Sequence, residues 1–184
     1  MRTTQGEQRA DAVMMNADFA NAITKLVPNN LRRRWTNEKV AKKDFSCSTF
    51  MLYLGVEGKF DHLAHHNIYV TKDYRRNLDE IERQHVLSED PSFYVENPVR
   101  TDATMAPPGH SALYVLLPVS HQHPNIDWSR ERERYRKVAL RQLAKVGLTD
   151  IEKRIRFERI VTPADWERQV GIYRGATFNL AHNL

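Results

Sequence analysis

Two long apolar runs in the middle of the chain predict buried strands. Residues 45–56 combine small, aromatic and β-branched residues, and the second half of this run is apolar at consecutive positions. Such a strand is typical of a sheet that is covered on both faces. Residues 111–119 form a second run, after the rigid turn 105–109 with its two prolines. We expect this strand to pair with the short strand 92–96, which ends at Asn97-Pro98.

The rest of the pattern predicts helices and short strands without regular alternation. Residues 129–146 carry an apolar stripe at helical spacing, and Gly147 follows where a C-terminal cap is expected. Asp18 is placed to cap a helix over 19–26. The predicted helices are 19–26, 31–43 (a helix or an irregular basic segment), 73–84, 129–146, 150–154 and 164–170, and the further predicted strands are 9–15, 67–70 and 155–161. This mixture predicts an α+β fold with a mixed, largely antiparallel sheet and packed helices.

Composition places the chain among ordinary globular proteins. Its 184 residues suit one domain, and 41% apolar with 28% charged residues argues against disorder. The apolar runs are far too short to span a bilayer, and the amino end carries no apolar signal-peptide core. Cys47 is the single cysteine, so no internal disulfide can form, which is natural in a reducing compartment. We expect a cytoplasmic protein that is soluble or peripheral to a membrane.

The charge of the chain raises the question of an anionic partner. The formal net charge is +5 and the pI is near 9.4. Most arginines alternate with glutamates, as in 130–134, which is typical of a solvated helix face. The unbalanced run is Arg32-Arg33-Arg34, followed by Lys39, Lys42 and Lys43. It is either a solvated face or a contact for a membrane or a partner.

Few residues carry obvious chemistry. Five histidines could offer metal ligands: His62, His65, His66, His121 and His123. His65 and His66 would point to opposite faces of an extended strand, and no HExxH helix supports them, so we predict strand-edge or loop histidines and no metal site. Cys47 fits a small buried hydrophobe better than a nucleophile. Asp102, Asp127 and Asp165 sit beside turns and fit helix caps and acids equally well, and we assign no catalytic residue.

Several motifs, in order along the chain, resemble one enzyme family. They are Lys43–Gly55, Leu63-Ala64-His65-His66, Ser88–Tyr94, Val99–Asp102, Ala106–Gly109, Tyr114–Val119, Thr162–Trp166 and Gly175–Phe178. Together they resemble the substrate domain of bacterial-type phytoene desaturases, flavoproteins that use FAD to oxidise carotenoid precursors. The resemblance covers nearly the whole chain.

The resemblance implies a portion of an FAD-dependent oxidoreductase that desaturates a long apolar polyene such as phytoene. It divides the chain into a remnant strand of the flavin domain (1–18), a substrate-binding domain (19–175) and the start of a return to the flavin domain (176–184). Asn16, Ala17 and Asp18 match the strand that passes close to the flavin. The chain has seven glycines and no GxGxxG, so the main flavin-binding segments are absent and we expect the isolated chain to be inactive.

A polyene channel needs apolar residues with few polar groups, and we predict Phe50, Leu52, Leu54, Tyr114, Leu116 and Phe178 for it. Because neighbouring strand residues face opposite ways, only one of the sets Phe50/Leu52/Leu54 and Met51/Tyr53 can line the channel. Peripheral membrane binding and self-association follow from the same resemblance, with no nucleic acid as partner. The alternative is a non-catalytic basic α+β module that binds RNA or an anionic surface through residues 32–43.

Overall fold

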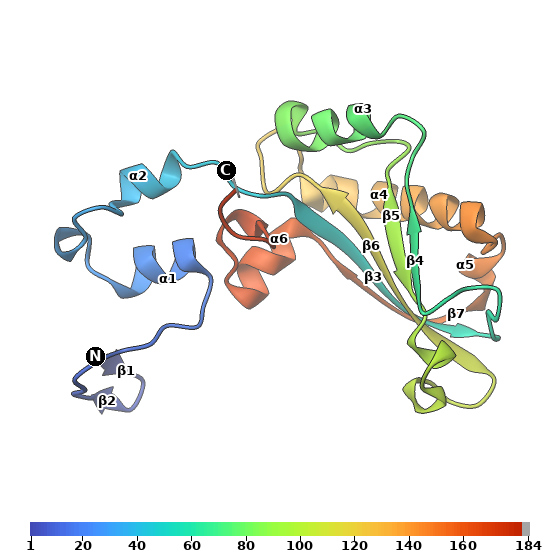
Figure 1. The fold of residues 1–184 in the computed structure, drawn as a ribbon, viewed down its shortest axis with the longest axis horizontal. Helices are drawn as coiled ribbons and strands as arrows, with labels where there is room; N and C mark the ends of the chain where they lie inside the picture. The colour runs from blue at the N-terminus through green and yellow to red at the C-terminus, as the bar shows by residue number, and fades with distance from the viewer. Residues whose placement is uncertain (182–184) are drawn as a thin grey trace.

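The computed structural model describes residues 1–181, which build one five-stranded sheet with helices around it (Figure 1). The strand order is β4-β5-β6-β3-β7, and every neighbouring pair is antiparallel. The strands are β3 (Ser48–Glu57), β4 (His66–Tyr69), β5 (Phe93–Glu96), β6 (His110–Val119) and β7 (Ile155–Val161). The α+β class and the largely antiparallel sheet are confirmed.

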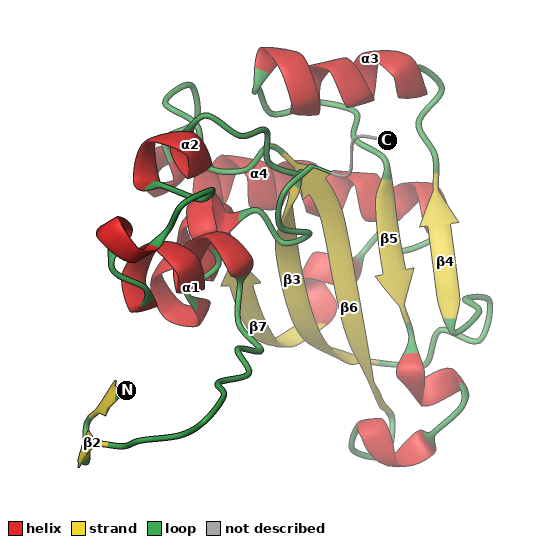
Figure 2. Ribbon diagram, turned by 60° about the vertical axis from the view of Figure 1, so that its left-hand side comes forward, coloured by secondary structure: helices red, strands yellow, loops and turns green. Residues whose placement is uncertain are grey.

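The helices lie mainly at one face and at the ends of the sheet (Figure 2). They are α1 (Phe19–Leu26), α2 (Asn37–Ala41), α3 (Tyr74–Asp79), α4 (Trp128–Leu143), α5 (Ile151–Arg154) and α6 (Pro163–Asp165). A π-helical turn extends α3 over Glu80–Gln84 and another extends α6 over Trp166–Val170. Short 3-10 turns cover Asn29–Leu31, Pro98–Arg100, Ala103–Met105, Ala144–Val146 and Tyr173–Gly175.

The main core lies between the sheet and α4. Phe50, Leu52 and Leu54 of β3 point to this side and are 0%, 0% and 2% exposed. The ring of Phe50 stacks on Trp128 at 5.8 Å and meets Tyr135 edge-on at 5.2 Å, so α4 is fixed to the middle of the sheet by aromatic contacts.

A second, smaller core joins the first helices to the end of the described chain. It consists of Ala20, Val40, Phe45 and Ala176. The Asn21 side-chain amide donates to the Gly171 carbonyl at 2.5 Å. The predicted cap is also present, since the Asp18 carboxylate accepts from the Asn21 backbone N–H at 2.8 Å.

The strand predicted over residues 9–15 is wrong. This segment is extended and exposed, with Met14 95% exposed, and the only strands before α1 are β1 (Arg2–Thr3) and β2 (Gly6–Glu7), which form a small hairpin. An apolar run becomes a strand only when another strand satisfies its backbone groups, and none within residues 1–181 pairs with it. The assignment of 1–18 to a flavin domain stays a prediction. The same holds for 176–184, of which 182–184 lie outside the described residues.

A buried carboxylate fixes the junction of α4, β7 and α6. Asp165 forms a capping box with Thr162, accepting from its backbone N–H at 3.0 Å and its hydroxyl at 2.9 Å. Arg132 of α4 donates to the same carboxylate at 2.9 Å and to the Ile160 carbonyl at 2.7 Å. Burial alone would raise the pKa of Asp165, but the Thr162 donors and the Arg132 guanidinium hold this pKa below its usual range.

Replacing this carboxylate should therefore destabilise the fold. We expect Asp165→Ala to lower the free energy of unfolding by about 1.5 to 3 kcal/mol at pH 7, the range for a hydrogen bond to a charged group. Because the pKa is lower in the folded state, the stabilisation is present above the unfolded value of about 3.9 and is lost as pH falls through the folded value. Urea unfolding of both proteins at pH 7 and at decreasing acidic pH measures this difference.

The control is Asp127→Ala, which removes an exposed carboxylate that caps α4 through the Ser129 N–H. Loss of an exposed cap should cost about 1 kcal/mol. Equal losses for the two variants would contradict a special role for the Asp165 junction.

Candidate functional site

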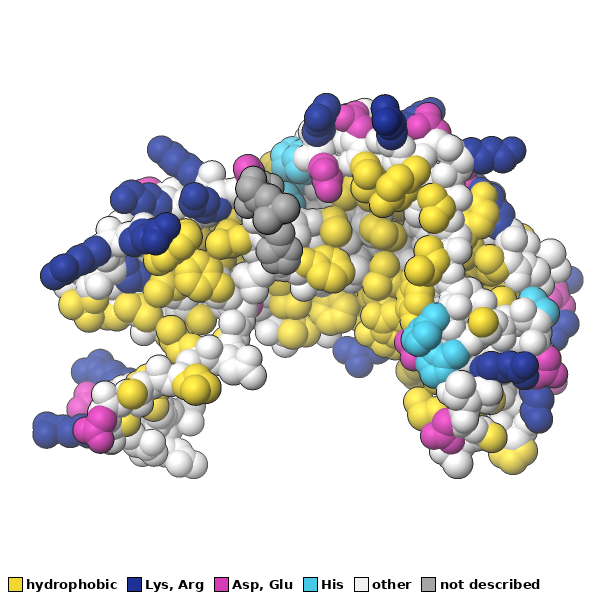
Figure 3. Space-filling view, viewed as in Figure 1, with side chains coloured by type: hydrophobic (Ala, Val, Ile, Leu, Met, Phe, Trp, Pro, Cys, Tyr) yellow, Lys and Arg dark blue, Asp and Glu magenta, His cyan; other side chains and the backbone are white. Residues whose placement is uncertain are grey.

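The face of the sheet opposite α4 carries apolar and aromatic side chains that no helix covers over most of its area (Figures 2 and 3). Strand register places Tyr53 beside Tyr114 and Met51 beside Leu116, with Tyr94 of β5 beyond Leu116. We call Tyr53, Tyr94, Tyr114 and Leu116 the open face; Met51 lies on the same side of β3 but is fully buried. Its edges on β4 and β7 carry Ile68 and Phe157, which are 75% and 60% exposed.

Three tyrosines cross the open face as a ladder. The rings of Tyr53 and Tyr114 meet edge-on at 5.3 Å, and those of Tyr114 and Tyr94 at 6.0 Å. Burial raises the pKa of Tyr114, with a smaller effect of Tyr53, and burial together with Glu96 raises the pKa of Tyr94. The Tyr94 and Tyr114 phenols are therefore uncharged at neutral pH. The open face therefore presents an apolar and aromatic surface with only a few polar atoms.

The six residues predicted for the channel do not share one surface. Phe50, Leu52 and Leu54 point into the core against α4, whereas Tyr114 and Leu116 lie on the open face. Phe178 is elsewhere, 54% exposed beside the start of β3. The prediction mixed two sides of the sheet because it did not apply strand alternation across the β3–β6 pair.

Sequence reasoning gave Met51 and Tyr53 only as the alternative set and missed Tyr94. The sequence did contain a signal for the sides of β3. The predicted helix 129–146 has an apolar stripe that must pack on one face of the sheet, and Phe50, Leu52 and Leu54 are the β3 side chains that pack against it. The substrate contacts of all six predicted residues remain predictions.

A cleft of about 700 Å³ lies where β3 begins and β6 ends. Cys47, His85, His121, His123 and Phe178 are among its lining residues. The rings of His85 and His123 stack at 4.2 Å, and His85 and His121 meet edge-on at 5.4 Å. His85 has a left-handed backbone (φ 51°), which a non-glycine residue adopts only under local constraint.

The pKa values of three side chains in this cleft are shifted toward the neutral form. Burial, followed by the charges of His85 and Arg174, lowers the pKa of His121 to about 4. Burial and His123 lower the pKa of His85, while burial and Glu82 raise the pKa of the Cys47 thiol. At neutral pH the His85 and His121 imidazoles are therefore neutral, and the Cys47 thiol is a poor nucleophile.

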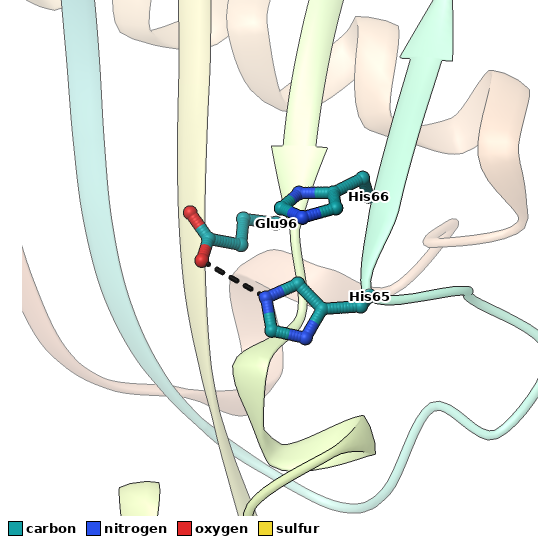
Figure 4. A group of neighbouring side chains, drawn as sticks. All are labelled: His65, His66 and Glu96. Carbon is teal, nitrogen blue, oxygen red and sulfur yellow. Dashed lines mark hydrogen bonds and ion pairs between the residues drawn. The ribbon is translucent and has the colours of Figure 1, made fainter.

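A third group of polar side chains lies at the β4–β5 edge of the open face (Figure 4). His65 Nε2 is 3.1 Å from Glu96 Oε1, and His66 Nδ1 is 2.6 Å from the Tyr94 hydroxyl. His65 and His66 do lie at a strand edge, as predicted. The expectation that they point apart is wrong, because β4 begins only at His66 and their ring centroids are 4.3 Å apart.

The residues predicted to approach a flavin form no phosphate cradle. Asn16 and Ala17 are exposed in an extended segment. The Asp18 carboxylate is already used, since it accepts from the N–H groups of Asn21 at 2.8 Å and Tyr173 at 3.3 Å. By themselves these three residues do not fit a flavin site, and their contact with a cofactor stays a prediction.

In the basic run Arg32-Arg33-Arg34, the first arginine is buried and the other two are exposed. Arg32 is only 7% exposed, and its guanidinium donates to the Trp35 carbonyl at 3.0 Å and to Asn37 Oδ1 at 2.8 Å. Arg33 and Arg34 are exposed, next to the half-buried Trp35. Arg32 therefore fixes the turn before α2, and only the other two arginines can meet a partner.

No helix in residues 1–181 combines the length and the apolar character needed to cross a membrane. No family model matches the chain. Individual proteins do match: the chain is 44% identical over 179 residues to a 4,4'-diapophytoene desaturase (4,4'-diapolycopene-forming) of Methylomonas, a match that covers 97% of this chain and 35% of that protein.

Two further relatives give the same picture. Identity is 42% over 176 residues to an all-trans-zeta-carotene desaturase of Myxococcus xanthus, covering 94% of this chain and 33% of the relative. It is 34% over 179 residues to a neurosporene-forming phytoene desaturase of Rhodobacter capsulatus, covering 95% and 34%. The chain spans about one third of the length of these curated relatives. The resemblance carried by the motifs is confirmed: over nearly its whole length the chain is related to the phytoene and carotenoid desaturases, and it matches about one third of the length of each.

Proposed function

We propose that this chain is the substrate-facing part of an FAD-dependent carotenoid desaturase, and that its open face lies against a long apolar polyene such as phytoene. The observation that carries the proposal is the partly exposed row of Tyr53, Tyr94, Tyr114 and Leu116 on the side of the sheet opposite the α4 core. Covering such a surface with a polyene gains about 25 cal/mol for each Å² of apolar area removed from water. The names of the relatives supply the substrate class.

Desaturation removes two hydrogens from a carbon–carbon single bond, one as a hydride and one as a proton. On this proposal FAD, when bound, accepts the hydride. The chain has no GxGxxG motif, so on this proposal most of the flavin contacts come from outside it. The chain's own contribution is to bind and align the polyene. The basic-module alternative explains only the charge of the chain and not its similarity to desaturases.

Membrane docking is the second part of the proposal, because carotenoid precursors dissolve in the bilayer. The surface of α1 and α2 is rich in Lys and Arg (Figure 3) and carries exposed Leu26 and Leu31, at 67% and 69%. Trp35 packs edge-on against Phe19 at 5.0 Å, with the Arg34 guanidinium 5.4 Å from its ring. Cations for anionic headgroups beside apolar and indole side chains suit a peripheral contact. We propose a cytoplasmic protein docked on the lipid surface.

A charge placed on the open face should weaken polyene binding and lower the turnover of the substrate. For the assay, this chain replaces the matching third of the Methylomonas 4,4'-diapophytoene desaturase, and conversion of 4,4'-diapophytoene is followed by chromatography. We expect Leu116→Asp to lower turnover at least about tenfold, since a carboxylate would be desolvated against hydrocarbon. The isolated Leu116→Asp chain should also bind a fluorescent conjugated polyene less tightly and self-associate less than the wild type.

The control is Val170→Asp, which introduces the same charge at a residue that is 60% exposed and is not one of the open-face residues. It should retain conversion and polyene binding. If Leu116→Asp behaves like the control in both measurements, with unchanged circular dichroism, the open face is not the polyene surface.

Removal of two arginines should weaken lipid binding. We expect Arg33→Ala/Arg34→Ala to lower the partition coefficient onto anionic vesicles about tenfold or more, because each basic residue near such a surface adds about 1 kcal/mol. Co-sedimentation with anionic and neutral vesicles measures the change. The attraction should also weaken with salt.

The control Lys72→Ala/Arg75→Ala removes two exposed cations near α3 and should bind like the wild type. Equal partitioning of the Arg33/Arg34 variant and the wild type would remove this surface as the docking site. Binding of single-stranded RNA without binding of vesicles would favour the basic-module alternative.

A further inference from the structure

We propose that His65, His66 and Glu96 form a binding site for a divalent transition-metal ion of the zinc class. One ligand atom of each of these side chains lies within 4.8 Å of the others (Figure 4). Among the described residues this is the one group of three such side chains that meets that distance. The inference rests on geometry alone and does not depend on the proposed desaturase function.

The site is built on the sheet. His66 of β4 and Glu96 of β5 are register partners, so their side chains rise on the same face. His65 belongs to the bend before β4, and Asn67 fixes this bend. The Asn67 side chain accepts from the Ala64 N–H at 3.0 Å and donates to the carbonyls of Ala64 at 2.8 Å and Val95 at 3.1 Å. The bend therefore brings the His65 imidazole close to that of His66.

Thr101 and Tyr94 form hydrogen bonds with the three side chains, and such bonds orient metal ligands. His65 Nδ1 is 2.6 Å from the Thr101 hydroxyl, which leaves Nε2 directed at Glu96, 3.1 Å away. The Tyr94 hydroxyl lies 2.6 Å from His66 Nδ1 and donates to Glu96 Oε2 at 3.3 Å. Ligating histidines commonly have their second ring nitrogen held in this way. The hydrogen bonds thus fix both rings and the carboxylate before any ion arrives.

The donor set selects the class of ion. Two imidazoles and one carboxylate suit Zn²⁺ and related ions such as Co²⁺, whereas Ca²⁺ and Mg²⁺ prefer oxygen ligands only. Three protein ligands leave at least one position of a tetrahedral ion for water. His85, His121 and His123 form a second histidine cluster among the described residues, at the cleft. The rings of His85 and His123 are stacked there, and the ring nitrogens of the cluster do not converge as metal ligands would.

The test uses the full chain freed of metal by chelation, with ZnCl₂ followed by calorimetry and CoCl₂ by visible absorption. We expect one equivalent to bind, with a Co²⁺ absorption typical of low coordination number and a Tm that rises with Zn²⁺. His66→Ala and the isosteric Glu96→Gln should abolish these signals. Thr101→Val, which removes only the outer hydrogen bond to His65, should weaken Zn²⁺ binding roughly tenfold or more.

The control is the double variant His85→Ala/His123→Ala, which should keep wild-type affinity and stoichiometry. Circular dichroism without metal shows whether each variant is folded, and Glu96→Gln changes no volume. The proposal is overturned if the wild type binds no stoichiometric Zn²⁺, or if a folded Glu96→Gln binds as tightly as the wild type. It is equally overturned if the His85/His123 variant alone loses binding.

Discussion

The pairing of β3 with β6 is the contact on which the rest of the structure depends. Ten residues of each strand are paired without a break, from Ser48 opposite Val119 to Glu57 opposite His110. This register sends Phe50, Leu52 and Leu54 to one side and Met51 and Tyr53 to the other. Because side chains alternate along a strand, a slip of one residue would exchange the two sets. The aromatic packing of α4 on Phe50 is the energetic reason that the observed register is kept.

The two faces made by this register then take different roles. One is closed by α4 and supplies the stability of the domain. The other has its end covered by the Trp166 indole, which donates to the Thr49 carbonyl at 3.1 Å and hydroxyl at 3.0 Å, while the rest stays open. The imidazole and carboxylate side chains lie at the borders of the open face and not in its middle. One group is His65, His66 and Glu96 at the β4–β5 edge, and the other lines the histidine-rich cleft at the strand ends.

Much of the fold was predictable from local signals, and the site was less so. The strand over 45–56, the strand 111–119, the long helix and the Asp18 cap all follow from periodicity and capping chemistry, which are local. The strand predicted over 9–15 failed because pairing is a long-range property. Arg32 could not be told from Arg33 because burial depends on the turn that places Trp35 and Asn37 around its guanidinium. The expectation that His65 and His66 point apart was wrong because one bend, fixed by Asn67, replaces an extended strand at His65.

The contact of α1 with the segment after α6 closes the described chain on itself, since Asn21 and Gly171 are 150 positions apart and hydrogen-bonded. The whole five-stranded sheet lies between these two positions in the sequence (Figure 1). Next to the hydrogen bond, the smaller core of Ala20, Val40, Phe45 and Ala176 forms a neck that holds the two ends of this segment together. A pulling force applied to residues 18 and 181 would load this neck first and reach the β3–β6 ladder only after the neck had opened. The hydrogen bond and the small core would thus bear tension applied at these two positions before the sheet does.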